Sequence, residues 1–385
     1  MSTKGIFRMS TKGKLKLIKL IFLLVFCASM NSNNLNAQTL TENIEFNFSS
    51  HQELWRHLIW LQYYETSLST TIDLKNENKL RIYGSIFWVN GQSIGNNIHG
   101  ISNIEADRGF EILESWIQFE SNSSFSLKFG IVDLNSQFDH IESADFFINP
   151  SQGIGPDLSN TGLYGPSIFP YTSLGLEIIF TKNNWKISSG LFDSNSRITR
   201  KLHPEPNYKL SLDEGVLFIS EYSTKQRNIG VTLGSWLSTH ENNDKYPIGE
   251  SPIAFGIGLN KISSGIYSHL YSNNKNIDWY LRVGSSNSNT ELISKYVGGG
   301  IIYKLKDTSS FGASFGSAGF SKLYKSIFDY RVQNSKHPYE HVIELSFKTI
   351  ESKFSTQPNL QYTINSKGYK NRNLLFYGIR VTIEI

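Results

Sequence analysis

The end of the chain alternates strictly between apolar and mixed side chains. Every second residue from Leu375 to Ile385 is apolar, and the residues between them are Phe376, Gly378, Arg380, Thr382 and Glu384. Successive side chains of a strand point to opposite faces, so this segment has one apolar face and one mostly polar face. The closing strand of an outer-membrane barrel needs both, because one face meets lipid and the other a wet lumen. A strand of a soluble sandwich can show the same pattern, so the rest of the chain must decide.

Similar alternation recurs along the chain. Sixteen candidate strands can be marked, at 44–49, 61–74, 80–88, 111–119, 125–134, 174–181, 185–191, 216–222, 229–237, 265–272, 279–284, 296–305, 311–315, 339–348, 354–365 and 372–385. One face of 354–365 carries only Ser, Gln, Asn and Thr, which no soluble core would favour and which suits a watery lumen. The strand-like segment 253–259 is expected to lie within a folded loop, because counting it would disturb the order of the turns.

The connections alternate in length as well. Short ones lie at 75–79, 120–124, 182–184, 223–228, 273–278, 306–310 and 349–353, and mostly long ones at 89–110, 135–173, 192–215, 238–264, 285–295 and 316–338. Bacterial outer-membrane barrels have an even strand number, short turns at one end and long loops at the other. The sequence therefore predicts an all-β fold, a 16-stranded antiparallel transmembrane β-barrel with long extracellular loops. A structureless connection as long as 135–173 argues against a compact soluble domain, whereas in a barrel it would be an extracellular loop able to fold into the pore.

The first 37 residues have the pattern of an export signal. Residues 1–19 carry six basic side chains and no acid, the apolar run Leu20–Ala28 follows, and Leu35-Asn36-Ala37 ends the segment. This predicts a signal peptide at 1–37, cleaved after Ala37, and a barrel domain at 38–385. The apolar run is too short for a membrane helix. A lipoprotein anchor at Cys27 is the competing interpretation, which bulky Phe26 disfavours, and Met9 is a second candidate start.

Removing this segment changes the charge and the cysteine content. It takes six of the 37 lysines and arginines and none of the 33 acids, which leaves a net charge near −2. The basic character of the whole chain therefore gives no support for a nucleic-acid partner. Cys27 is the only cysteine, so the exported chain would have neither disulfides nor thiolate chemistry.

No group of residues points to catalysis or to a bound metal. Asp139 and His140 are adjacent in the long connection, but no candidate nucleophile accompanies them. The nine histidines lack metal-ligand spacing, and the chain has no phosphate loop, dinucleotide glycine motif or nucleophile elbow. We therefore expect no enzyme, no cofactor and no metal, although barrels with enzyme activity exist.

An ordered series of short motifs resembles the carbohydrate-selective porin family of the OprB type. The series comprises Gly100-Ile101-Ser102-Asn103-Ile104-Glu105-Ala106, Glu114-Ser115-Trp116, Gly130, Asp133, Phe138, Phe147-Ile148-Asn149, Ser151, Pro170, Leu174-Gly175, Tyr339-Glu340, Ile343-Glu344, Gln357-Pro358, Leu360-Gln361-Tyr362, Gly378 and Arg380. The resemblance implies a 16-stranded barrel through which sugars diffuse passively across the outer membrane. Two positions depart from the family pattern, because Glu111 stands where arginine is common and Ile385 replaces a final aromatic residue.

The expected pore constriction lies where the long connection 89–110 returns to the barrel wall. The candidate solute-contacting residues are Arg81, Tyr83, Glu105, Arg108, Glu111, Glu114 and Trp116. Trp116 shares its parity with Glu114 and Gln118, which favours the lumen over the alternative of a lipid-interface aromatic girdle. Glu340, Glu344 and Lys348 are expected to form a paired charge ladder inside the barrel instead of contacting solute.

The predicted function is passive diffusion of carbohydrates through a water-filled pore. The expected partners are carbohydrate solutes, outer-membrane lipid and the outer-membrane assembly machinery, and a homo-oligomer is compatible with the sequence. Three alternatives stay open: a general or non-sugar porin, a plugged structural or adhesive barrel, and a soluble secreted β-sandwich.

Overall fold

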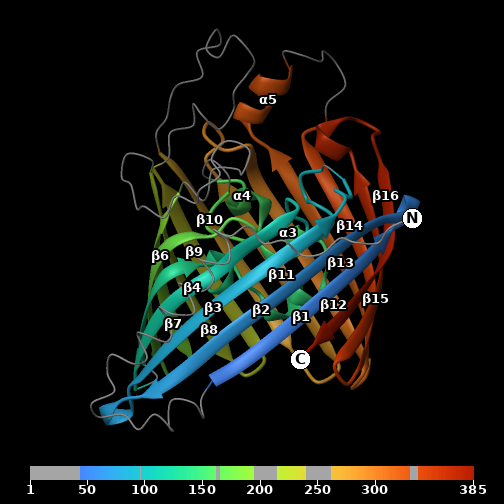
Figure 1. The fold of residues 1–385 in the computed structure, drawn as a ribbon. Helices are drawn as coiled ribbons and strands as arrows, with labels where there is room; N and C mark the ends of the chain where they lie inside the picture. Colours follow the sequence, from blue (N-terminus) through green and yellow to red (C-terminus); the bar gives the residue numbers. More distant parts are fainter. Residues whose placement is uncertain are drawn as a thin grey trace.

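Sixteen antiparallel strands close into one barrel (Figure 1). The computed structural model describes residues 44–95, 97–122, 124–161, 165–194, 215–239, 262–329 and 337–385. The strands are β1 Ile44–Trp55, β2 Ile59–Asp73, β3 Lys79–Gly91, β4 Gly109–Ser121, β5 Phe125–Val132, β6 Ser173–Lys182, β7 Trp185–Asp193, β8 Val216–Gln226, β9 Ile229–Ser238, β10 Ser263–Asn273, β11 Ile277–Ser286, β12 Ile293–Lys306, β13 Ser309–Phe320, β14 Tyr339–Glu351, β15 Phe354–Ile364 and β16 Leu374–Glu384.

The predicted fold class is confirmed, and each expected strand has a counterpart. Most strands run a few residues further than the alternation indicated. Each strand pairs with its neighbours in sequence, and β1 closes the ring against β16 from Ser49↔Glu384 to Trp55↔Gly378. The expected signal peptide at 1–37 and the loop segment 253–259 lie outside the described residues.

The outer surface of the barrel carries the apolar rows. On β16 the side chains of Tyr377 and Ile379 are exposed, whereas Arg380 and Thr382 on the other face are buried. The same division holds around the ring, with exposed Leu233 on β9 and Leu281 on β11. A continuous apolar exterior of this kind is what a barrel needs in the hydrocarbon of a bilayer.

The two ends of the barrel have different connections. At one end, the short-turn end, lie tight links such as η2 Lys75–Glu77. The opposite, long-loop end carries the long connections, including α5 Lys322–Asp329 and η5 Ser366–Gly368. The link between β1 and β2 at the long-loop end is the exception, since η1 Arg56–Leu58 has only three residues. In bacterial barrels the short turns face the periplasm.

Two connections from the long-loop end fold into the barrel. They are 92–108, between β3 and β4, and 133–172, between β5 and β6, which holds η3 Leu134–Ser136, η4 Glu142–Phe146, α3 Pro150–Gly153 and α4 Pro156–Ser159. In Figure 1 the green part of the chain that carries α3 and α4 lies within the ring of strands. The long connection thus enters the barrel, which the sequence left open as one course for an extracellular loop of this length. No helix in the described part of the chain is long and apolar enough to cross a membrane.

Glycines on the inner faces of β11–β13 leave room for the second connection. A methyl group added at Gly284 would overlap Asp157, and one at Gly300 or Gly312 would overlap Phe147 or Phe146. Side chains of the inserted loop therefore occupy the space that side chains at these wall positions would need.

The outward position of Leu281 gives a test of which face meets lipid. We expect Leu281→Arg to lower the free energy of unfolding by about 2–4 kcal/mol, because a charge would enter hydrocarbon. Urea titration of the barrel in lipid vesicles, followed by the gel shift between unboiled and boiled samples, measures this change. Ser69→Arg on the lumen side of β2 is the control and should cost little. Equal losses for the two variants would contradict the assignment of faces.

Candidate functional site

The inner surface of the barrel divides into two regions. The inner faces of β8–β15, here called the covered wall, lie behind the inserted connections, and their polar side chains are buried, among them His269, Arg282 and Glu344. The inner faces of the short-turn halves of β1–β5, here called the open wall, carry half-buried residues such as Glu65 and Tyr83. A solute that crosses the barrel therefore has the open wall available to it.

Buried carboxylates of β14 accept hydrogen bonds from the inserted backbone. Glu344 accepts from the N–H groups of Ile148 and Asn149 at 2.8 and 3.0 Å. Glu340 accepts from Ile98 at 2.8 Å and His99 at 3.1 Å. The expected paired charge ladder is thus wrong: within the described residues neither glutamate is in an ion pair. Amides inside a barrel need acceptors, and an ionised carboxylate is a strong one.

The polar row of β15 also binds the inserted connections. Gln357 donates to the carbonyl of Phe146 at 2.7 Å, and Gln361 donates to that of Ile101 at 2.8 Å. Gln361 also accepts from the side chain of Asn149 at 2.9 Å. The sequence correctly indicated a hydrogen-bonding face, but its partners are protein groups and not the water of an open lumen.

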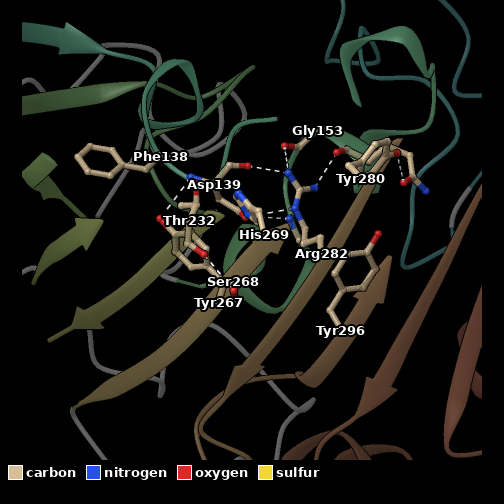
Figure 2. A network of polar contacts seen from close by, with 12 residues as sticks. Phe138, Asp139, Gly153, Thr232, Tyr267, Ser268, His269, Tyr280, Arg282 and Tyr296 are labelled. Carbon is tan, nitrogen blue, oxygen red and sulfur yellow. Dashed lines mark hydrogen bonds and ion pairs between the residues drawn. The ribbon is translucent and has the colours of Figure 1, made fainter. Parts of the chain in front are cut away.

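Asp139 is the centre of a buried polar network that joins the long connection 133–172 to the covered wall (Figure 2). Its carboxylate lies 2.5 Å from Nε2 of His269 and 3.2 Å from Nε of Arg282. Arg282 also donates to the carbonyls of Gln152 at 2.6 Å, Gly153 at 2.9 Å and Asp139 at 2.7 Å. Burial alone would raise the pKa of Asp139, but the Arg282 charge and the His269 hydrogen bond outweigh it and lower that pKa.

A second ion pair holds the first connection. Arg380 on β16 contacts Glu53 on β1 at 2.5 Å and Asn103 in the connection at 2.6 Å. Ser102 donates to Glu53 at 3.0 Å. Two residues of the 100–106 motif thus tie the loop to the strands that close the barrel.

Two of the candidate site residues form an aromatic stack on the open wall. The rings of Tyr83 on β3 and Trp116 on β4 are 5.0 Å apart and 17° from parallel. Nζ of Lys128 lies 4.9 Å from the centre of the Trp116 ring and 2.9 Å from Glu177. Trp116 therefore faces the lumen, as its parity indicated, and does not belong to an aromatic girdle.

Three further candidates share the inner faces of β3 and β4. Nε of Arg81 pairs with Glu120 at 3.2 Å, close to the short-turn end. Glu114 accepts from the N–H of Asp133 at 3.1 Å, so it also anchors the start of the long connection. Glu111 pairs in register with Phe87, whose side chain points inward, and so faces the lumen.

The remaining two candidates lie on the first connection and not with the aromatic stack. Glu105 accepts from Ser93 at 2.5 Å and from the N–H of Ile94 at 3.2 Å, and burial raises its pKa. Arg108 donates to the carbonyl of Gly91 at 3.1 Å. Both close the base of a loop, which is a structural task that the sequence could not distinguish from solute contact.

Sequence reasoning missed His269 and Arg282 as functional residues. The one available signal was an inward-facing basic residue in a strand, set against an acidic residue in the longest connection. Asp139 and His269 are 130 positions apart, and nothing local in the sequence joins them. Within the described residues, no cluster of three or more His, Cys, Asp or Glu could hold a metal ion.

Comparisons with known proteins agree with this geometry. A family model described as carbohydrate-selective porin, OprB family, matches residues 64–385. The high-pH structure of Pseudomonas putida OprB superimposes with a TM-score of 0.73 at 13% identity, covering 90% of this chain and 95% of that chain. A mutant of Rh. blastica porin superimposes with a TM-score of 0.53 at 9% identity, covering 89% and 100%. The chain has no significant match among curated protein sequences.

Removing the Arg282 side chain should release the long connection. We expect Arg282→Ala to lower the free energy of unfolding by about 3–5 kcal/mol, because Asp139 stays buried and loses the opposite charge of Arg282. The mean single-channel conductance and its noise should both rise. Planar-bilayer recording measures this, with Lys304→Ala as the control, which removes a half-exposed ion pair with Asp278. A folded R282A channel with wild-type conductance and noise would contradict the anchoring role.

Asp157 on α4 should make stability depend on pH. Burial, and next the charge of Asp139, raises the pKa of Asp157 to about 7 from its ordinary 3.8. Between these values the folded state binds more protons than the unfolded state, so stability falls as pH rises. Asp157→Asn should therefore gain up to about 4 kcal/mol at pH 8 and nothing at pH 4. Urea midpoints in detergent at the two pH values measure this; exposed Asp73→Asn should follow the wild type, and an equal effect of D157N at both pH values would refute the prediction.

Proposed function

The chain belongs to the carbohydrate-selective porin, OprB family, and from this membership we propose that carbohydrates diffuse passively along its open wall. Movement follows the concentration gradient of the solute alone. The family and the barrel fold are those of a channel, which is a different task from catalysis.

The Tyr83–Trp116 stack is the observation that carries the proposal. Two nearly parallel rings on the open wall offer an apolar surface to the C–H face of a sugar. Lys128 and Glu114 lie beside the rings and can exchange hydrogen bonds with hydroxyl groups. Both groups already have partners in the chain, Lys128 in Glu177 and Glu114 in the N–H of Asp133, so a hydroxyl gains little from them and binding stays weak enough for the solute to leave.

The inserted connections supply the restriction in width. They cover the inner faces of β8–β15 and are held by buried charge-assisted hydrogen bonds, so they do not behave as a loose plug. The passage that remains is one-sided. A solute must slide along the open wall, where aromatic and charged groups select what passes.

The charge of the inner faces of β2–β5 supports a second candidate, a porin for cations or for general small solutes. Glu65, Glu111, Glu114 and Glu120 outnumber Arg81 and Lys128 on the inner faces of β2–β5. An acidic passage disfavours anions and admits neutral or cationic solutes. Neutral sugars fit both candidates, so the tests must compare sugars with ions.

We also place the protein in the outer membrane, with residues 1–37 as its export signal. The apolar exterior of the barrel would contact outer-membrane lipid, and the assembly machinery would insert it. The family and the fold support the location, whereas the signal rests on the sequence pattern alone.

Sugar block of the ion current tests the leading proposal. Liposomes that contain the protein should swell in glucose or maltose, and maltose should reduce the single-channel conductance. Trp116→Ala should raise the half-blocking maltose concentration about 2- to 10-fold, because one aromatic contact is lost. Trp88→Ala is the matched control, since Trp88 packs against Tyr64 on the outer surface.

Each outcome separates the candidates. Swelling without any maltose block of the wild type would favour the general porin. No swelling at all would indicate a plugged barrel. If W116A leaves the maltose block unchanged, the aromatic stack is not part of the sugar-binding site.

A further inference from the structure

A separate cavity opens on the short-turn side of the aromatic stack. It has a volume of 520 Å³ and joins three distant parts of the chain, with His51, Glu65 and Ser67 from β1 and β2, Tyr83 from β3, and Lys353 and Glu384 from the β14–β15 turn and the end of β16. Sites for small ligands span about 300–1,000 Å³, so this space can hold one or two sugar rings.

Neighbouring side chains fix the polar groups of this cavity. Glu65 accepts a hydrogen bond from the hydroxyl of Tyr63 through Oε2 at 2.7 Å, and its Oε1 has no partner among the described residues. Nδ1 of His51 lies 2.9 Å from Oγ1 of Thr382, and the His51 ring lies 5.6 Å from that of Tyr63. A carboxylate oxygen and an imidazole edge are thus held in place beside an open space. Groups that are already ordered lose little entropy on binding.

We propose that this cavity is a second carbohydrate subsite, on the exit side of the Tyr83–Trp116 stack. The inference rests on the proposed function and adds to it a place where the solute pauses after the stack. Glu65 would accept hydrogen bonds from sugar hydroxyls, and His51 and Ser67 would complete the polar contacts. Tyr83 borders both the stack and the cavity, so a sugar can move from one to the other without leaving the wall.

The charges around the cavity favour a neutral polyhydroxylated solute. Two carboxylates, Glu65 and Glu384, line the cavity together with the ammonium group of Lys353 and the imidazole of His51. Both charge signs and a neutral imidazole are present, so the lining offers donors and acceptors for hydroxyl groups together. Lys353 is exposed at the turn, so solute reaches this space directly from the short-turn side.

Sidedness follows from this position. Maltose added on the short-turn side enters the cavity before it meets the stack, whereas maltose from the long-loop side meets the inserted connections and the stack first. Loss of the cavity contacts should therefore affect block from the short-turn side more than block from the other side.

The test is maltose block of single channels of the full-length mature protein, with the sugar added to one side at a time. His51→Ala and Glu65→Gln should each raise the half-blocking concentration from the short-turn side at least threefold, and change that from the long-loop side by less than half as much. Asp278→Asn is the matched control, because it neutralises a carboxylate at the same end on the opposite part of the ring.

A chemical variant covers the case in which H51A or E65Q fails to fold. The exported chain has no cysteine, since Cys27 lies in the expected signal. Lys353→Cys places a thiol at an exposed turn, and a bulky neutral maleimide there should raise the half-blocking concentration from the short-turn side at least threefold. Lys275→Cys, labelled in the same way at the β10–β11 turn, should block like the wild type.

The outcomes separate this inference from the proposed function. If maltose blocks the wild type and none of the cavity variants changes the short-turn side, the second subsite is refuted while sugar passage stands. Equal changes from both sides would also refute it, because the loss would then belong to the stack. If maltose neither passes nor blocks, both the subsite and the proposed function are overturned.

Discussion

The interior of this barrel depends on carboxylates that accept hydrogen bonds from the backbone of the inserted connections. Glu344 and Glu340 do so from β14, Glu114 binds the N–H of Asp133 from β4, and Glu221 binds that of Asp139 at 3.1 Å from β8. A connection without regular structure brings many unpaired amides into a space with little water, and each unpaired amide is costly. Acidic residues at inward strand positions meet this need. They determine where the connections lie and therefore which part of the wall is left for solute.

The strands could be predicted because their signal is local. Alternation with a period of two requires only a few neighbouring residues, and lipid on one side makes it strict along 375–385. The order of short and long connections then gave the strand number and the two ends. Strand ends were predicted less well. On β1 and β2 the alternation is weak beyond Ser49 and before Leu61, yet pairing extends to Trp55 and Ile59.

Glu111 faces the lumen, as expected for a constriction residue, although strict alternation would not place it there. Counting by twos from Trp116 would turn Glu111 toward lipid. The pairing of β3 with β4 shifts between Ser85 and Ile86, which leaves Leu113 as an extra residue and returns Glu111 to the lumen. The hydrogen-bond partners of the inward-facing residues could not be predicted from the sequence. Asn149 and Glu344, for example, are 195 positions apart. Glu105 and Arg108 were predicted as constriction residues, and the structure places them at the base of the first connection. No local pattern in the sequence indicates the path of a loop.

The same residue types serve two purposes on the two walls, and the source of their hydrogen-bond partners makes the difference. On the covered wall Glu344, Gln361 and Tyr280 are saturated by groups of the chain itself, for example Tyr280 by Gln152 at 2.6 Å. On the open wall Glu65 keeps one oxygen without a partner in the described chain, and water or a passing hydroxyl can take it. Groups whose hydrogen bonds are all made hold the inserted connections rigidly, because breaking one such bond leaves a buried charge or amide without a partner. Groups with a free hydrogen-bonding position let solute bind and leave, because a sugar hydroxyl replaces water there at little net cost. A rigid covered wall is thus the condition for a selective open one: the width of the passage stays fixed while the contacts along it stay weak.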